Sequence, residues 1–178
     1  LFADGPVHFE GEHYRVSGLE GTPKPLQRPH PPIAIGGGGP RVLALAAREA
    51  DIVGINVHLA VGVIDDRAGP NATEEATQAK VDIIRSAAGD RFDDLELQVR
   101  VHAMVVTDDR QGMAELMAPA LGISPAAALA SPHALAGSSE EIAADLRARR
   151  DRWGISYITV SLDALDAMAP VVARLAGT

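Results

Sequence analysis

Short apolar runs alternate with longer segments of helical periodicity from residue 33 onward. Four such runs, rich in Ile and Val, predict strands at 33–35, 51–56, 95–107 and 155–160. Apolar residues at helical spacing predict helices at 40–50, 71–88, 108–118, 125–130, 138–153 and 163–176. A loop through Gly62, Asp65 and Asp66 separates the second strand from its helix. Alternating strands and helices indicate a parallel sheet with right-handed crossovers.

Residues at the helix boundaries predict how these helices begin and end. Asn71 is the expected N-cap of the helix that Gly89 terminates. Ser138 and Glu141 have the spacing of a capping box, in which each residue bonds the backbone of the other. Asp163 is the expected cap of the last helix.

The first 32 residues follow a different pattern. Two short segments of β-forming residues flank the turn at 10–12, which predicts a β-hairpin. Residues 23–32 are rich in proline, which removes backbone donors, so we expect an extended connector here. The connector is either a rigid lead-in or a polyproline ligand for a partner module. We therefore divide the chain into a hairpin and proline-rich lead-in, 1–32, and an α/β region, 33–178.

Four strand–helix units are too few for a closed eight-stranded barrel, and they match half of one. The length of 178 residues is also well short of the roughly 250 that a complete (β/α)₈ barrel requires. The fold class expected is therefore α/β of the (β/α)₈ TIM-barrel type, with this chain as a half barrel. A small doubly wound nucleotide-binding domain is the alternative.

Composition narrows the range of functions. The 16 basic and 24 acidic residues give a net charge of −8, which argues against a general nucleic-acid binder. The apolar runs are too short for a membrane span, and no basic and apolar leader opens the chain, so we expect a cytoplasmic protein. The absence of Cys excludes disulfides, thiolate catalysis and Cys-zinc sites. Because the first methionine is Met104, we expect the chain to be a piece of a longer protein.

The strongest candidate site is the glycine run that joins the first strand of the α/β region to its helix. Its members are Gly36, Gly37, Gly38 and Gly39. A strand that runs through glycines into a helix N-terminus presents bare amides and the positive end of the helix dipole, which bind phosphate. Arg41, in the first helical turn, either adds positive charge or is simply solvated. The alternative for the glycine run is a tight turn that needs positive φ.

Other candidates lie where predicted strands end, because ligands gather at the carboxyl ends of strands in parallel α/β folds. Asn56 either hydrogen-bonds a ligand or simply ends its strand, and Ser161 follows the last strand. His102 faces away from the apolar side of its strand, as either a pocket-lining residue or a chemical group. Residues 137–139 form a second amide cluster at a helix N-terminus, although capping alone explains them.

Two further patterns receive a structural interpretation. His8 and His13 lie in the hairpin without a carboxylate partner, so we expect no metal site there. The helix at 138–153 carries basic and acidic residues that we expect to form exposed ion pairs along one helix. They are Arg147, Arg149, Arg150 and Arg152 with Glu140, Glu141, Asp145 and Asp151.

Taken together, several motifs resemble the C-terminal half of the luciferase-like monooxygenase superfamily. They are Phe9-x-Gly11-x-x-Tyr14, Pro25-x-Gln27-x-Pro29-x-Pro31-Pro32-Ile33, Ile35-Gly-Gly-Gly-Gly39 and Ala46-Ala47-Arg48-x-Ala50-Asp51. Three more segments are similar to the deazaflavin (coenzyme F420)-dependent oxidoreductases within that superfamily. They are 50–56, 90–97 and Arg150-x-x-x-Gly154-Ile-Ser-Tyr157. The likeness covers nearly the whole chain.

The resemblance implies a cofactor and a reaction. It implies a (β/α)₈ barrel of which this chain is about the last four units, with the phosphate of F420 on the amides of Gly37, Gly38 and Gly39. Asn56 corresponds by position to a cofactor contact. The implied reaction is hydride transfer between F420 and a small organic substrate, whereas relatives that use FMN activate oxygen. FMN is therefore the alternative cofactor.

The resemblance also implies that half of a barrel is missing. The first half would carry much of the cofactor cradle and the acid/base residues, so no catalytic residue is predicted here. We expect the exposed sheet edges to be covered by self-association or by a missing N-terminal half. The alternative function is a non-catalytic half-barrel module that assembles with a partner chain.

Overall fold

The computed structural model describes residues 1–58 and 68–177. The chain forms two compact units, Leu1–Ile33 and Ala34–Thr178, which are described separately. The predicted loop residues Gly62, Asp65 and Asp66 lie outside the described residues. Within the described ranges, no helix combines the length and the apolar character that crossing a bilayer requires.

The first unit contains the predicted hairpin. Strands β1 (Val7–Glu10) and β2 (Arg15–Leu19) pair antiparallel. The amide of Gly11 donates to the carbonyl of Tyr14 at 2.9 Å and closes the turn. The proline-rich connector contains neither helix nor strand, as predicted, because proline cannot donate to a hydrogen-bond ladder.

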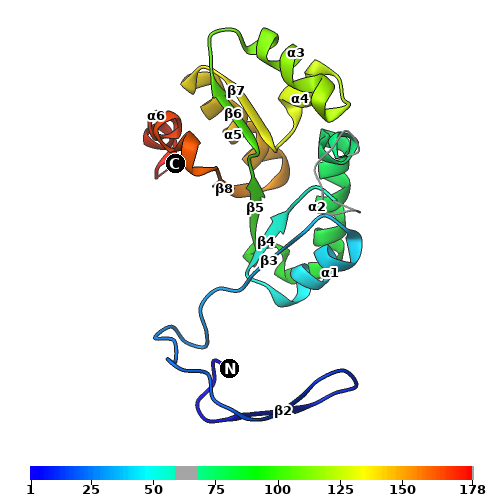
Figure 1. Ribbon diagram of the computed structural model, residues 1–178, viewed down its shortest axis with the longest axis vertical. Coiled ribbons are helices and arrows are strands. Elements are labelled where there is room, and N and C mark those ends of the chain that lie inside the picture. The colour runs from blue at the N-terminus through cyan, green and yellow to red at the C-terminus, as the bar shows by residue number, and fades with distance from the viewer. Residues whose placement is uncertain (59–67, 178) are drawn as a thin grey trace. The chain divides into compact units, whose positions relative to one another are not determined.

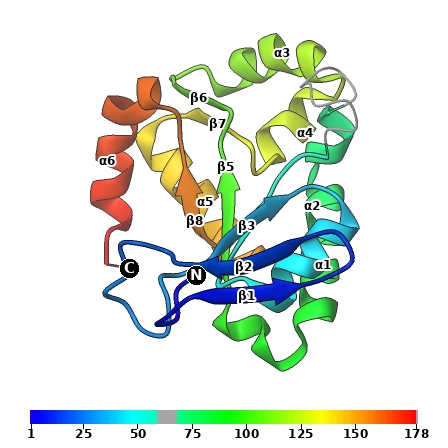
Figure 2. The ribbon, with the colours of Figure 1, turned by 60° about the horizontal axis from the view of Figure 1, so that its bottom comes forward.

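The second unit is built on parallel strands (Figures 1 and 2). The main sheet has the order β3-β4-β5-β8, and β6 pairs with β7 in a second, two-stranded sheet. Every one of these pairings is parallel. The strands are β3 (Ala34–Gly37), β4 (Ile52–Ile55), β5 (Glu96–Arg100), β6 (Ala103–Val106), β7 (Ala134–Gly137) and β8 (Ile155–Thr159).

Helices connect these strands, which confirms the predicted alternation. They are α1 (Pro40–Glu49), α2 (Glu74–Ala88), α3 (Arg110–Leu121), α4 (Pro125–Ala130), α5 (Ser139–Trp153) and α6 (Leu165–Leu175). Short 3₁₀ turns span Gly69–Ala72, Gly89–Asp94 and Leu162–Ala164. The α/β class and the parallel sheet therefore agree with the sequence pattern.

The two faces of the main sheet differ. One face packs against α1, α2 and α5 in a core of apolar side chains. This core contains Leu43, Ala46, Ala47, Val53, Ile55, Val81, Ile84, Leu97, Val99, Trp153 and Ile155. The opposite face carries small and polar residues, including Gly36, Gly54 and Gln98 in one register row. One helix-covered face and one face of different character are what half of a (β/α)₈ barrel presents.

The predicted strand 95–107 is wrong as a single strand, because it divides into β5 and β6. The amide of Val101 donates to Thr159 of β8 at 2.9 Å, whereas the amide of the next residue, His102, donates to His133 at 2.8 Å. The extended chain thus changes its pairing partner between these two residues. The sequence pattern missed β7 altogether, because its residues Ala-Leu-Ala-Gly have little β-propensity.

Helix capping was predicted correctly at some positions and wrongly at others. The capping box of α5 and the termination of α2 at Gly89 are confirmed. Asn71 is wrong as a cap, because it lies in a 3₁₀ turn and Thr73 caps α2 instead. Asp163 is also wrong, because it lies in the 3₁₀ turn that precedes α6.

The ion-pair lattice predicted along α5 is wrong, because charged residues of this helix bond to other elements. Asp145 pairs with Arg110 of α3 at 2.8 Å, and Arg152 pairs with Glu74 at the start of α2 at 2.6 Å. Arg149 is buried rather than exposed. These charges therefore join helices to one another instead of stabilising a single helix.

Candidate functional site

The glycine run joins β3 to α1 at the carboxyl edge of the sheet. Strand β3 ends at Gly37, and α1 begins at Pro40 with Gly39 as its N-cap. Gly39 provides no side-chain cap, and the first turn of α1 contains no acidic residue. Helix geometry leaves the amides of Arg41 and Val42 without a partner inside the helix. This N-terminus therefore offers donors and a positive dipole end to an anion.

Close packing against backbone explains Gly38, and side chains crowd the positions of Gly36 and Gly37. A Cβ atom on Gly38 would lie 2.5 Å from the carbonyl carbon of Val57, and one on Gly37 would lie 2.5 Å from Cγ1 of Val42. A Cβ atom on Gly36 would lie 2.9 Å from Nδ2 of Asn56. None of the four glycines has a positive φ, so the tight-turn explanation is wrong. Gly38 lies directly against the backbone that leaves β4, whereas Gly37 and Gly36 lie against the side chains of Val42 and Asn56.

Gly39 differs from the other three glycines. A Cβ atom on Gly39 would lie at van der Waals distance, 3.6 Å, from Nε2 of His58. His58 is exposed, and its amide donates to Oδ1 of Asn71 at 2.6 Å. Its imidazole therefore lies beside the start of α1. His58 was not among the predicted site residues, although it lies just beyond a strand end, which is the signal that singled out Asn56.

A buried lysine fixes the chain that leaves β4. Nζ of Lys80, on α2, donates to the carbonyls of Asn56 at 2.9 Å and Asn71 at 2.7 Å. Burial lowers the pKa of Lys80 to about 8. Lys80 thus joins the end of β4 to the turn that precedes α2. Helical periodicity could not reveal this role, because it depends on which residues the fold brings together.

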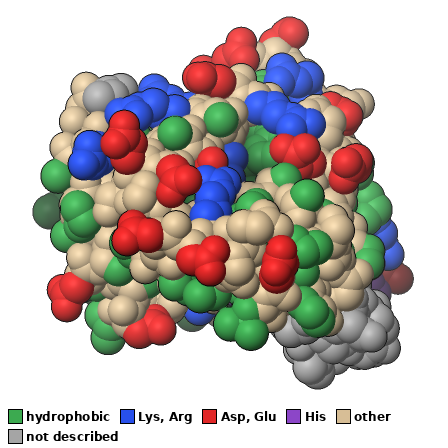
Figure 3. Space-filling model, turned by 90° about the horizontal axis from the view of Figure 1, so that it is seen from above, with side chains coloured by type: hydrophobic (Ala, Val, Ile, Leu, Met, Phe, Trp, Pro, Cys, Tyr) green, Lys and Arg blue, Asp and Glu red, His purple; other side chains and the backbone are tan. Residues whose placement is uncertain are grey.

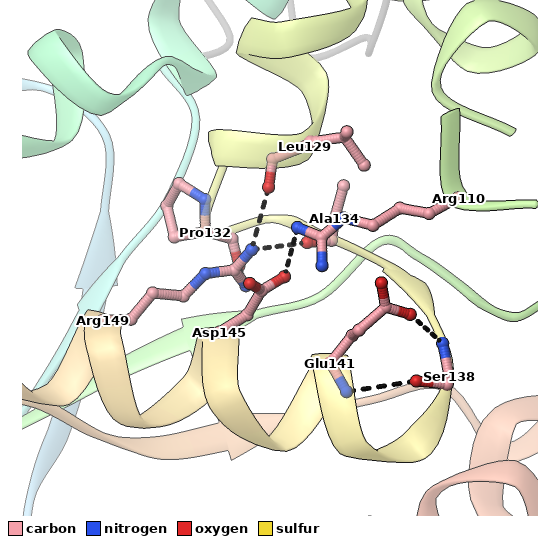
Figure 4. A network of polar contacts seen from close by, with 8 residues as sticks. All are labelled: Arg110, Leu129, Pro132, Ala134, Ser138, Glu141, Asp145 and Arg149. Carbon is pink, nitrogen blue, oxygen red and sulfur yellow. Dashed lines mark hydrogen bonds and ion pairs between the residues drawn. The ribbon is translucent and has the colours of Figure 1, made fainter. Parts of the chain in front are cut away.

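The second predicted amide cluster, residues 137–139, has a different environment (Figure 4). Oε2 of Glu141 accepts from the amide of Ser138 at 2.8 Å, and the amide of Glu141 donates to Oγ of Ser138. The Ser138 amide lowers the pKa of Glu141. The chain's own carboxylate therefore occupies this N-terminus, which leaves it as a capping site.

His102 lies between β5 and β6, close to His133, a histidine that the sequence pattern did not single out. The ring centroids of His102 and His133 are 5.7 Å apart. Nδ1 of His133 bonds the carbonyl of Arg100 at 3.0 Å, so Nδ1 carries the proton and Nε2 is the acceptor. Burial lowers the pKa of His133 to about 4, and the imidazole is neutral at physiological pH. Both rings border an apolar cavity of about 60 Å³.

The structure brings some of the predicted site residues together and leaves others apart. The structure brings the glycine run and Asn56 together, with Arg41 in the adjoining first turn of α1. Ser161 follows β8 and starts the 3₁₀ turn before α6. That the glycine run, Arg41 and Asn56 bind a cofactor stays a prediction.

Solved structures with a similar fold come from several enzymes. The chain superposes on the F420-dependent tetrahydromethanopterin reductase from Methanopyrus kandleri with a TM-score of 0.64 and 14% identity, covering 96% of this chain and 57% of that chain. An F420-dependent secondary alcohol dehydrogenase gives 0.62 and 15%, covering 97% and 57%. A riboflavin lyase with modified FMN gives 0.60 and 13%, covering 96% and 48%.

These superpositions identify the fold as about half of a luciferase-like TIM barrel. The chain spans about half the length of each of these structures. The family model described as luciferase-like monooxygenase matches residues 1–155, which confirms the resemblance at the level of the family. The chain belongs to the luciferase-like monooxygenase family.

Proposed function

We propose that this chain is the cofactor-phosphate-binding half of an F420-dependent oxidoreductase that transfers hydride between F420 and a small organic substrate. Two of the similar structures are named as F420-dependent enzymes. The motifs shared with F420-dependent oxidoreductases favour this cofactor. An FMN-dependent monooxygenase is the second candidate, because a similar structure contains modified FMN.

The uncapped N-terminus of α1 is the observation that carries the proposal. Both F420 and FMN carry a phosphate, and this N-terminus supplies what a phosphate needs. The amides of Gly38, Gly39, Arg41 and Val42 surround the start of the helix, and no side-chain carboxylate of the helix's own first turn competes for them. The side chain of Arg41 is exposed there and adds a positive charge. The residues present therefore fit the phosphate group.

A backbone hydrogen bond between Asn56 and Gly37 fixes the geometry of the chain at this site. The amide of Asn56 donates to the carbonyl of Gly37 at 3.0 Å, which extends the β3–β4 pairing beyond the strands. Lys80 holds the carbonyl of the same asparagine. The phosphate would therefore meet a preorganised backbone, and little entropy would be lost when it binds. The cofactor itself would supply the hydride chemistry.

One face of the main sheet carries small and polar residues and lies opposite the face that the helices cover. This face supports the view that the functional unit is larger than this chain. A (β/α)₈ barrel fills its interior with side chains from all eight strands. We propose that an N-terminal half or a second copy of this chain completes the barrel, and that the organic substrate binds in the completed unit. A non-catalytic half-barrel module would bind neither cofactor.

Fluorescence titration of the chain with F420 and with FMN tests the proposal. We expect saturable binding of F420, tighter than that of FMN. The variant Gly39→Asp places a carboxylate at the helix start, where Cβ has room, and should weaken binding at least about tenfold, or 1.4 kcal/mol.

Gly39→Asn is the matched control, because asparagine caps a helix as well as aspartate but carries no charge. It should weaken binding less than Gly39→Asp does. Tighter binding of FMN would favour the second candidate. Failure to bind either cofactor, or equal affinity in all three proteins, would contradict the proposal.

A further inference from the structure

A pocket of about 390 Å³ lies among the helices of the second unit. Residues of α2, α3, α4 and α5 line it, whereas the glycine run lies between β3 and α1. Figure 3, seen from above relative to Figure 1, shows a face on which basic and acidic side chains are intermixed around a hollow. The volume falls in the range of small-molecule sites.

The charges of the side chains that line the pocket do not sum to zero. Three arginines and two carboxylates line it, which leaves one positive charge in excess. Arg110 pairs with Asp145 at 2.8 Å, and Arg152 pairs with Glu74 at 2.6 Å. The charge left over by these two pairs is that of Arg149.

Arg149 is held in a fixed pose deep in the pocket wall (Figure 4). Its guanidinium donates to the carbonyls of Ala134 at 2.9 Å and of Leu129 and Pro132 at 3.4 Å. The side chain is 5% exposed, and burial lowers its pKa to about 10, so it remains a cation at neutral pH. Carbonyl dipoles solvate this cation but carry no net charge, so an anion in the pocket would be attracted to it.

Apart from Gln111, the uncharged residues that line the pocket are apolar. These apolar residues are Leu129, three alanines of α4 and α5, and Trp153. Arg152 lies over the indole of Trp153, 4.9 Å from the ring centroid, so the charged and the apolar parts of the pocket adjoin. A free inorganic anion would leave the apolar wall without a partner, whereas an anion with a hydrocarbon group would use both parts.

We propose that this pocket binds a small organic monocarboxylate. The carboxylate lies against the partly exposed guanidinium groups of Arg110 and Arg152, whose planar donors suit carboxylate oxygens, and the buried charge of Arg149 attracts it from within the wall. The hydrocarbon part lies against Leu129 and Trp153. One negative charge on the ligand matches the single excess positive charge of the lining. This site shares no residue with the glycine run, so it stands or falls independently of the proposed cofactor.

Trp153 makes the test specific, because it is the single tryptophan of the chain and lines the pocket. Tryptophan fluorescence of the full chain is followed during titration with butyrate, butyramide and inorganic phosphate. We expect a saturable change with butyrate, a much weaker response to phosphate, and none with the neutral butyramide. Equal responses to butyrate and butyramide, or a phosphate affinity above that of butyrate, would overturn the proposal.

Two partly exposed charges allow the sign of the effect to be tested. Arg152→Gln leaves Glu74 without its partner and lowers the net charge of the lining from +1 to zero, so it should weaken butyrate binding about fivefold. Asp145→Asn frees Arg110 and should tighten binding about fivefold. Arg147→Gln is the matched control, because Arg147 lies on the same helix and lines a different pocket. Its affinity should equal that of the unmodified chain. Affinities that do not change in opposite directions in the first two variants would overturn the proposal.

Discussion

Two junctions in this chain have the same order of elements and different chemistry. At both, a parallel strand runs through glycine into a helix: β3 into α1 through residues 36–39, and β7 into α5 through Gly137. Glu141 reaches back to the Ser138 amide at the second junction and occupies the helix N-terminus. The first turn of α1 has no acidic residue and no side-chain cap.

The difference shows when a helix N-terminus can serve as an anion site. Unsatisfied amides and the positive dipole end are common to all helices, so they do not distinguish a binding site from a cap. The α5 junction places Glu141 at the third helical position and satisfies its own amides. The α1 junction has Val42 at that position, together with glycines that let the chain leaving β4 lie against it. Of the two junctions, the one at α1 is therefore the one that we propose for a phosphate, because its own first turn supplies no carboxylate.

The largest expected effect concerns packing at the open junction. Gly38→Ala forces a Cβ atom to within 2.5 Å of the Val57 backbone, which cannot rotate away as a side chain can. We expect the free energy of unfolding to fall by about 3 kcal/mol in urea titrations. Gly39→Ala is the control, because its Cβ has room, and its loss should stay below about 1 kcal/mol. Equal losses would contradict the packing explanation of the glycine run.

The lysine that supports the open junction should give a smaller, pH-dependent effect. Lys80 has a pKa of about 8 in the folded chain, against its ordinary value of 10.5. Between these values the unfolded chain binds a proton that the folded chain lacks, so stability rises with pH. Relative to Lys80→Met, the unmodified chain should gain on the order of 2 kcal/mol between about pH 8 and 10. Parallel stability curves for the two proteins would refute the burial-lowered pKa.

The two junctions also show which features the sequence could predict and which it could not. The capping box of α5 could be predicted because Ser138 and Glu141 interact at a fixed spacing within one helix. The glycine run could be singled out, but the reason for it could not, because Val57 and Val42 approach it only in the folded chain. The same holds for β7, whose pairing with β6 overrides a weak propensity, and for the long-range contacts of Lys80, His133 and Arg149. Periodicity predicted the elements, whereas contacts distant in sequence define the sites.

The smallest expected effect concerns the closed junction. The Ser138 amide lowers the pKa of Glu141 below the ordinary 4.5, so Glu141 stabilises the fold above that pH and loses this contribution as the pH falls through its folded pKa. Glu141→Gln should therefore be less stable than the unmodified chain at pH 7, with a difference that shrinks toward pH 3 in urea titrations. Glu140→Gln, which removes a carboxylate from the same turn but leaves the capping box, should show a weaker pH dependence. If both variants behaved alike, the general attraction of acids to the helix dipole would explain the cap, and the specific bond to Ser138 would not distinguish α5 from α1.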